Sequence, residues 1–153
     1  MIAHLNYYKN VDFETKQKHI LFLKNLQNYY LDEQNRLFIH AGFTNMNGIA
    51  YEYFPKLFYW DRTLWETALS LDTSIPTDSL FYPRRLTLYD EIYIGHTPVT
   101  RIGKTIPIQK ACVWNLDTGA AFKGPLTIMD VDTKEYWQSE PLNELYFNEK
   151  GRN

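Results

Sequence analysis

Two histidines stand at the ends of short apolar runs. His40 follows Leu37-Phe38-Ile39, and His96 follows Ile92-Tyr93-Ile94 after one glycine. Apolar runs of this length that stop at turn residues predict buried strands, so each imidazole is expected at a strand end. An imidazole in that place can ligate a transition metal, although a single one more often hydrogen-bonds a nearby carbonyl group. The two matching corners together strengthen the case for a metal site without making it the more frequent outcome, and the hydrogen-bonded alternative stays open for each.

Four short motifs follow one another in an order that is a specific signal of a protein family. Leu37-Phe38-Ile39-His40-Ala41-Gly42 is followed by Trp60-Asp61-Arg62, then by Ile92-Tyr93-Ile94-Gly95-His96-Thr97-Pro98, and last by Asp117-Thr118-Gly119. This order resembles the second half of the calcineurin-like metallophosphoesterases, and in particular their bacterial serine/threonine protein phosphatase branch. The resemblance implies that His40 and His96 ligate the second of two metal ions. It also implies that Arg62 holds the substrate phosphate and that Asp117 to Gly119 are structural.

Arg62 also suits a phosphate on physical grounds. Helical spacing of apolar residues predicts a helix from Asp61 to Leu71. If Asp61 caps this helix, Arg62 lies in its first turn, where a guanidinium group and free backbone N–H groups can contact phosphate oxygens together. The alternative is an ordinary solvated arginine. Arg84, Arg85 and Arg101 are expected to be solvated basic residues beside turns, and His4 and His19 are expected to be structural or surface residues.

The motifs that carry most of the family's metal ligands do not occur in the sequence. It contains no Asp-x-His, no Gly-Asp-x-x-Asp-Arg and no Asn-His. We therefore expect residues 1–153 to form a single partial domain, the C-terminal half of the enzyme, with no catalytic residue of its own. Two imidazoles fall short of the three protein ligands usual for a catalytic zinc, so this chain alone should bind metal weakly or not at all and should be inactive.

The resemblance also implies the cofactors and partners. The complete enzyme would hold two divalent metal ions, with manganese expected and iron or zinc also compatible with imidazole ligands. The expected substrate is a phosphoserine or phosphothreonine protein, while dinucleoside polyphosphates and cyclic nucleotides stay open. A separately encoded N-terminal half or a second copy should cover apolar surface left exposed. The alternative function is a non-catalytic binding or regulatory module, whose partner would contact the aromatic residues Tyr51, Tyr53, Phe54, Phe58 and Tyr59.

The expected fold class is α/β (α+β), a part of a two-sheet β-sandwich flanked by helices. Spacing predicts an amphipathic helix from Asp12 to Tyr30 with Asp12 as its N-cap, and then a polar turn at Asp32–Asn35. The runs Ala111–Leu116 and Leu126–Val131 are predicted to form a hairpin.

The composition excludes several classes of protein. A formal net charge of -2 gives no electrostatic reason to bind a nucleic-acid backbone. Charges or turn residues interrupt every apolar stretch before it could span a bilayer. The single cysteine, Cys112, cannot form an internal disulfide, so the cytoplasm is the expected compartment.

Overall fold

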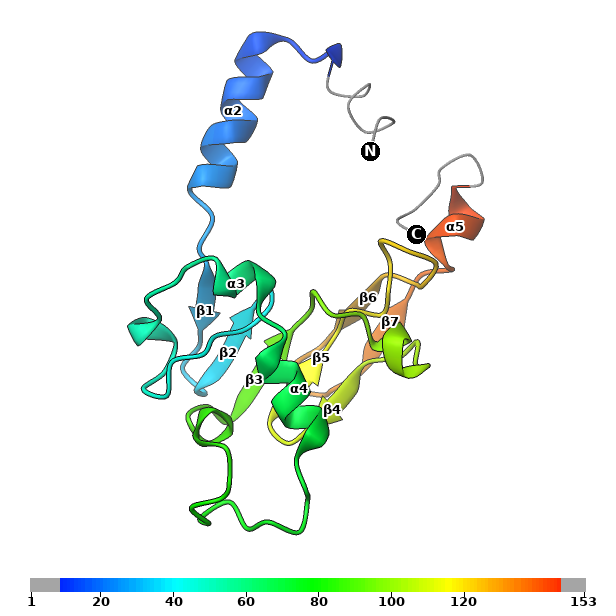
Figure 1. Ribbon diagram of the computed structural model, residues 1–153. Helices are drawn as coiled ribbons and strands as arrows, with labels where there is room; N and C mark the ends of the chain where they lie inside the picture. The colour runs from blue at the N-terminus through cyan, green and yellow to red at the C-terminus, as the bar shows by residue number, and fades with distance from the viewer. Residues whose placement is uncertain (1–8, 147–153) are drawn as a thin grey trace.

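The computed structural model describes residues 9–146 (Figure 1). In chain order its helices and strands are α2 (Phe13–Lys24), β1 (Tyr29–Leu31), β2 (Arg36–Ile39), α3 (Leu57–Trp60), α4 (Thr63–Ser70), β3 (Glu91–Ile94), β4 (Ile108–Lys110), β5 (Val113–Asn115), β6 (Thr127–Met129), β7 (Tyr136–Gln138) and α5 (Leu142–Leu145). Short 3₁₀ turns lie at Ile49–Tyr51, Arg84–Thr87 and Val99–Ile102. The chain is thus a mixed α/β fold, as its class was predicted.

A five-stranded sheet forms the centre of the fold. Its strand order is β1-β2-β3-β5-β4. The three inner strands β2, β3 and β5 are parallel, and β1 and β4 are antiparallel edge strands. Parallel neighbours end at the same edge of a sheet, so the loops that follow β2, β3 and β5 meet there. The predicted strands that precede both histidines are confirmed.

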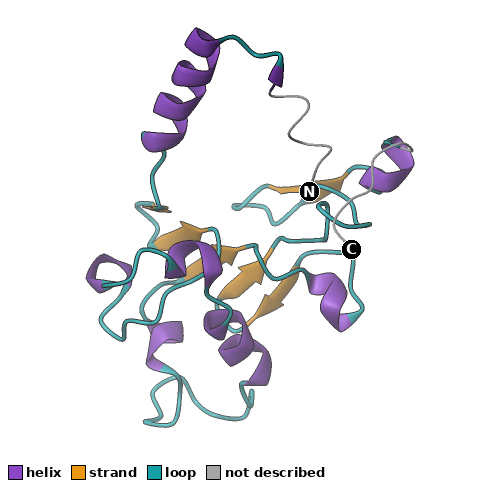
Figure 2. Cartoon of the chain, turned by 45° about the horizontal axis from the view of Figure 1, so that its top comes forward, coloured by secondary structure: helices purple, strands orange, loops and turns teal. Residues whose placement is uncertain are grey.

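One face of this sheet carries the hydrophobic core. Alternate residues of the inner strands point to it, and they form one buried cluster with residues of α3, α4 and the surrounding loops. Figure 2 shows helices lying along one side of the sheet. The sheet contributes Leu37, Ile39, Ile92, Ile94 and Val113, and the helices contribute Phe58, Leu64, Trp65 and Ala68. The Phe58 ring is only 5% exposed, so it belongs to the core and not to the exposed aromatic surface expected of a binding module.

The opposite face carries a row of aromatic residues. The strand register aligns Tyr30, Phe38, Tyr93 and Trp114 across β1, β2, β3 and β5. Phe38 and Tyr93 stack with ring centroids 4.9 Å apart. The turn between β6 and β7 covers part of the row, because Lys134 Nζ lies 5.3 Å from the centre of the Tyr93 ring. Helices therefore cover one face, and a two-stranded ribbon covers part of the other.

The predicted hairpin is wrong. The run at Ala111–Leu116 contains β5, which pairs with β4 and β3, whereas β6 pairs with β7 in a separate two-stranded sheet. The connection after β5 folds back on itself instead of turning between two paired strands. Gly124 N donates to Gly119 O at 2.9 Å, and Thr118 Oγ1 donates to Pro125 O at 2.8 Å. These bonds close the segment before β6 begins.

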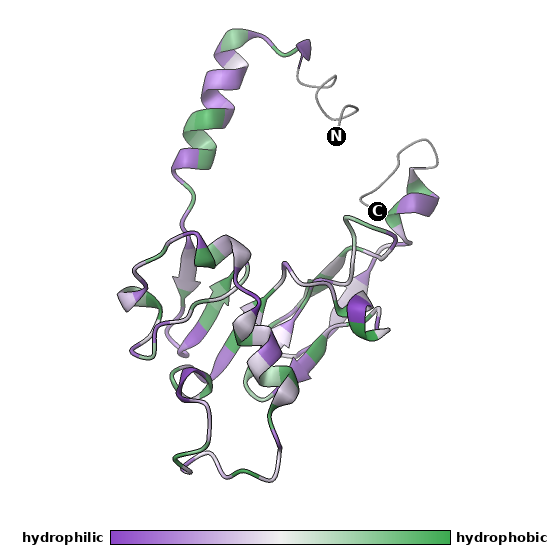
Figure 3. Ribbon diagram, viewed as in Figure 1, coloured by the Kyte–Doolittle hydropathy of each residue, from purple (hydrophilic) through white to green (hydrophobic). Residues whose placement is uncertain are grey.

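The first helix is shorter than predicted. Asp12 is the N-cap as expected, since its side chain accepts from Thr15 N at 2.9 Å. The helix ends at Lys24, however, and Tyr30 lies in β1, joined to β2 by the predicted polar turn. No side chain of α2 is buried against the part of the chain that the structure describes, although the helix contains Leu21, Phe22 and Leu23. Figure 3 shows a hydrophobic stretch within this helix, next to hydrophilic ones. Within residues 9–146, no helix combines the length and apolar character needed to cross a bilayer.

Candidate functional site

The two predicted histidines lie side by side at the carboxyl edge of the sheet. His40 directly follows β2, and His96 follows β3 after Gly95. Gly95 N donates to His40 O at 2.9 Å, which joins the two corners through the backbone. The centroids of the two imidazole rings are 5.1 Å apart, with an angle of 60° between their planes. The parallel pairing of β2 and β3 therefore produces the pair that the sequence suggested.

His96 is held in a tight turn. Its φ of 65° is in the left-handed region, and Thr97 N donates across it to Gly95 O at 2.7 Å. The Trp60 ring packs edge to face against the imidazole, with centroids 5.4 Å apart. His96 Nε2 is buried and has no hydrogen-bond partner among the residues that the structure describes. A buried ring nitrogen in this state is unsatisfied and needs a partner that the described residues do not supply.

The charges around His96 favour its neutral form. Partial burial lowers the pKa of His96 below its usual range, and the charges of His40, Arg62 and Arg101 lower it further. The carboxylate of Asp117 acts in the opposite direction. A neutral imidazole keeps a lone pair available, and this is the form that ligates metals.

Arg62 lies beside this pair, one residue earlier in its helix than expected. It occupies the position just before α4, and its side chain is exposed. Asp61 is the capping side chain, as predicted, and it accepts from Thr63 N and Leu64 N at 3.0 Å each. Because Asp61 occupies these two backbone N–H groups, they are not free for a phosphate. The guanidinium group of Arg62 remains exposed for that contact.

Two contacts hold the His40 loop against the Arg62 segment. Ala41 N donates to Phe58 O at 2.9 Å. Gly42 lies so close to Asp61 that a β-carbon added there would be 2.4 Å from Asp61 Oδ2. The His40-Ala41-Gly42 and Trp60-Asp61-Arg62 motifs thus form one packed unit, although 17 residues separate Gly42 from Trp60.

Three residues near His96 were not predicted as part of a site. Trp60 contacts the His96 ring, while Arg101 and Asp117 act on it through their charges. Asp117 follows β5 just as the histidines follow β2 and β3, and its Oδ1 accepts from Gly119 N at 3.0 Å. The signal that could have found Asp117 is its place after a third apolar run, since parallel strands bring such positions together.

The other basic and histidine residues have different roles. Arg85 was expected to be solvated, but it is buried. It donates to Phe43 O at 2.8 Å, to Thr63 Oγ1 at 3.1 Å and to Thr67 Oγ1 at 3.0 Å. Arg84 is exposed as expected and donates to Met46 O at 3.0 Å. His19 lies exposed on α2, and His4 lies outside the described residues.

The donor set fits part of a metal site. His40 and His96 offer two imidazole nitrogens, which suit iron or zinc, and which admit manganese when carboxylates complete the site. Within residues 9–146, no group of three or more His, Cys, Asp or Glu residues is arranged to hold a metal ion. The described residues therefore offer only two of the ligands that a metal site of this kind would need.

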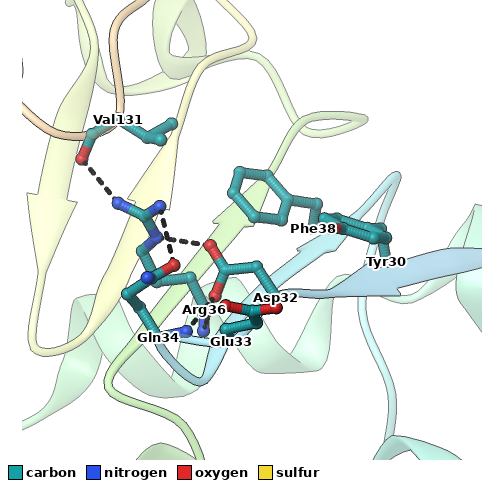
Figure 4. Close-up of a pocket in the computed structure, with 7 residues that line it drawn as sticks. All are labelled: Tyr30, Asp32, Glu33, Gln34, Arg36, Phe38 and Val131. Carbon is teal, nitrogen blue, oxygen red and sulfur yellow. Dashed lines mark hydrogen bonds and ion pairs between the residues drawn. The ribbon is translucent and has the colours of Figure 1, made fainter.

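A shallow pocket lies at the other end of the sheet. Tyr30, Phe38 and Val131 form its apolar wall, and Arg36 lies at its rim (Figure 4). Arg36 Nε donates to Asp32 Oδ2 at 2.6 Å, and its Nη1 donates to Asp132 Oδ1 at 2.5 Å. The cation is thus already paired, and it stands at the start of β2, whereas His40 follows the end of that strand. This pocket is separate from the histidine pair.

No protein-family model matches the chain, and a search of the curated proteins returns no match either.

Proposed function

We propose that this chain takes part in metal-dependent phosphoester hydrolysis, as the C-terminal half of a two-metal phosphatase of the calcineurin-like kind. In this proposal His40 and His96 ligate the second metal ion, and Arg62 holds the substrate phosphate. The five-stranded sheet is then one layer of that family's two-sheet sandwich. The observation that carries the proposal is the meeting of His40 and His96, with ring centroids 5.1 Å apart, beside Arg62.

Each of the three residues has its own task. His40 and His96 hold their nitrogens on the ends of paired strands, which fixes the direction from which they reach an ion. Arg62 orients the phosphate through the planar fork of its guanidinium group. Two bound divalent ions, when present, neutralise phosphate charge and lower the pKa of a bound water. Bridging carboxylates and the acid for the leaving oxygen come from residues outside this chain.

The exposure of the site supports a large substrate. His40 and Arg62 are both exposed at the edge of the sheet, so a phosphorylated side chain on a protein surface could reach them. Phosphoserine and phosphothreonine proteins are the proposed substrates for this reason and because of the resemblance in sequence. Manganese is the proposed metal, with iron or zinc as substitutes.

The test compares the chain alone with a completed protein. Hydrolysis of an aryl phosphate with added manganese is measured for the chain, and again after it is extended upstream or mixed with a candidate N-terminal half. We expect turnover only in the completed protein, with loss of turnover in His96→Ala and Arg62→Ala. His19→Ala and Arg84→Ala are the matched controls and should keep activity. Turnover by the chain alone would disprove the need for completion, and inactivity of every completed form would disprove the function.

A non-catalytic binding module is the second candidate. Its support is the exposure of three aromatic side chains, which is 60% for Tyr51, 81% for Tyr53 and 69% for Phe54. Tyr59 is less exposed, at 44%. Exposed rings of this kind often form the centre of a protein interface. Partner binding that persists in a His40→Ala/His96→Ala variant and is lost in Tyr53→Ala would favour this function over hydrolysis.

A further inference from the structure

The last residue of β5 is a fully buried polar side chain. Asn115 is 0% exposed, and a buried amide group is costly unless its hydrogen bonds are made. Its Nδ2 donates to Thr97 O at 2.9 Å. Its Oδ1 accepts from Asp117 N at 3.0 Å. One side chain therefore joins the loop that follows β3 to the loop that follows β5.

The loop after β3 needs such an attachment because of His96. A residue with a side chain adopts a left-handed φ at a cost, and persists there only when its surroundings hold it. Backbone bonds fix the loop on both sides, from Leu116 N to Ile94 O at 2.9 Å and from Val99 N to Asp117 O at 2.8 Å. Many sequences could make these backbone bonds. The contact to the residue directly after His96 depends on the Asn115 amide.

We propose that Asn115 is a positioning residue for the histidine pair. It fixes the turn at His96 so that the imidazole lies against the His40 and Trp60 rings, and it sets the loop that carries Asp117. This inference rests on the proposed function in one respect, because positioning the imidazole is useful only where the imidazole serves as a ligand. The hydrogen bonds of Asn115 do not depend on that function.

Asn115→Asp keeps one of the two side-chain hydrogen bonds and removes the other. The carboxylate keeps the shape and the acceptor for Asp117 N, but it places an acceptor against Thr97 O and so removes the hold on the turn. Thr118→Val is the matched control. Thr118 is 2% exposed, and its hydroxyl bonds to Pro125 O and Thr127 Oγ1, so the control removes an equally buried polar group whose bonds run toward β6.

The experiment records proton NMR contacts of the His96 ring in the metal-free chain at fixed pH. In Asn115→Asp the cross-peak between protons of the His96 and Trp60 rings should weaken at least ~3-fold. Its intensity falls with the sixth power of the distance, so moving one ring ~1 Å further away from a separation of 5.4 Å gives a loss of that size. In Thr118→Val it should match the wild type. An unchanged contact in Asn115→Asp, or an equal loss in Thr118→Val, would overturn the proposal.

A measurement on the wild type covers the case in which Asn115→Asp fails to fold. The side-chain amide protons of Asn115 should exchange with solvent at least ~10-fold more slowly than those of an exposed asparagine, because both of its polar atoms are bonded and buried. Exchange at the exposed rate would overturn the proposal. Added Mn²⁺ then tests the proposed function separately: wild-type His40 and His96 signals that do not broaden count against the metal site, while the metal-free comparison still decides the role of Asn115.

Discussion

Replacing Gly42 by alanine should damage the site through a single added carbon. The new β-carbon would lie 2.4 Å from Asp61 Oδ2 and 3.0 Å from Leu64 Cβ. Asp61 cannot easily move away, because it is 4% exposed and its carboxylate accepts from Thr63 N and Leu64 N. The substitution must therefore displace the cap of α4 and also strain the packing of the His40 loop against the helix.

The size of the effect follows from these two contacts. Loss of a capping carboxylate costs about 1 kcal/mol. Forcing extra volume into a packed region adds about 1 to 3 kcal/mol. We expect Gly42→Ala to lower the free energy of unfolding by about 2 to 4 kcal/mol, which is a fall in Tm of about 5 to 15 °C for a chain of this length.

Urea denaturation followed by circular dichroism measures the effect, with Gly95→Ala as the control. A β-carbon at Gly95 would make only ordinary contacts, 3.7 Å from His40 O and 3.8 Å from Asp117 Cβ, so a change within about 0.5 kcal/mol is expected. Shortening the neighbour should also relieve the clash, so Gly42→Ala combined with Asp61→Ser should cost less than the sum of the two single changes. A Gly42→Ala protein as stable as the wild type would refute this reasoning.

Three further substitutions test other parts of the fold. Arg85→Met removes buried hydrogen bonds to a carbonyl and two hydroxyl groups and should cost about 2 to 4 kcal/mol in urea denaturation, against less than about 0.5 kcal/mol for Arg84→Met. Equal losses in the free energy of unfolding for Arg85→Met and Arg84→Met would contradict the buried role of Arg85. Phe58→Ala should cost about 3 to 5 kcal/mol because the ring is in the core, whereas Tyr53→Ala, 81% exposed, should have little effect on the same assay. Burial raises the pKa of Glu91, but hydrogen bonds from the neighbouring ammonium and phenol groups bring it to a net value below the ordinary 4.5. Its charged form therefore stabilises the fold above that pH, and the stability is lost as the pH falls through the folded pKa. The stability difference between wild type and Glu91→Gln, on the order of 1 kcal/mol after solvent screening, should be largest near neutral pH and should shrink as the pH falls below the ordinary 4.5 and through the folded pKa of Glu91. A difference that grows in acid would contradict this sign.

The parts of the fold that the sequence predicted are those with strong local signals. The apolar runs before His40 and His96 end at glycine-containing turns, and Asp12 is a good capping residue, so two strands and a helix start were predicted correctly. The pairing of β5 could not be predicted. The two-residue turn before it has Ala111 at a φ of 49°, where glycine or asparagine would have been the usual signal.

The site was predictable where it depends on strand ends and not where it depends on distant contacts. His40 and His96 were predicted as a pair, and parallel pairing brings their rings together. Nothing local marks Arg85 as buried, because its partners Phe43, Thr63 and Thr67 are at least 18 residues away. The proximity of Asp117 to His96 likewise depends on the order of strands, which the periodicity of a sequence does not contain.

At position 96, the residues that best suit the left-handed backbone differ from the residue that supplies an imidazole. Glycine reaches a φ of 65° without the steric penalty of roughly 1 kcal/mol that a β-carbon brings, and asparagine tolerates it better than most residues. A library randomised at position 96 and selected for folding alone should therefore enrich glycine and asparagine over histidine. Histidine should prevail only when the selection also rewards what an imidazole can do. The residue recovered at this position would thus report which of the two properties a selection had acted on.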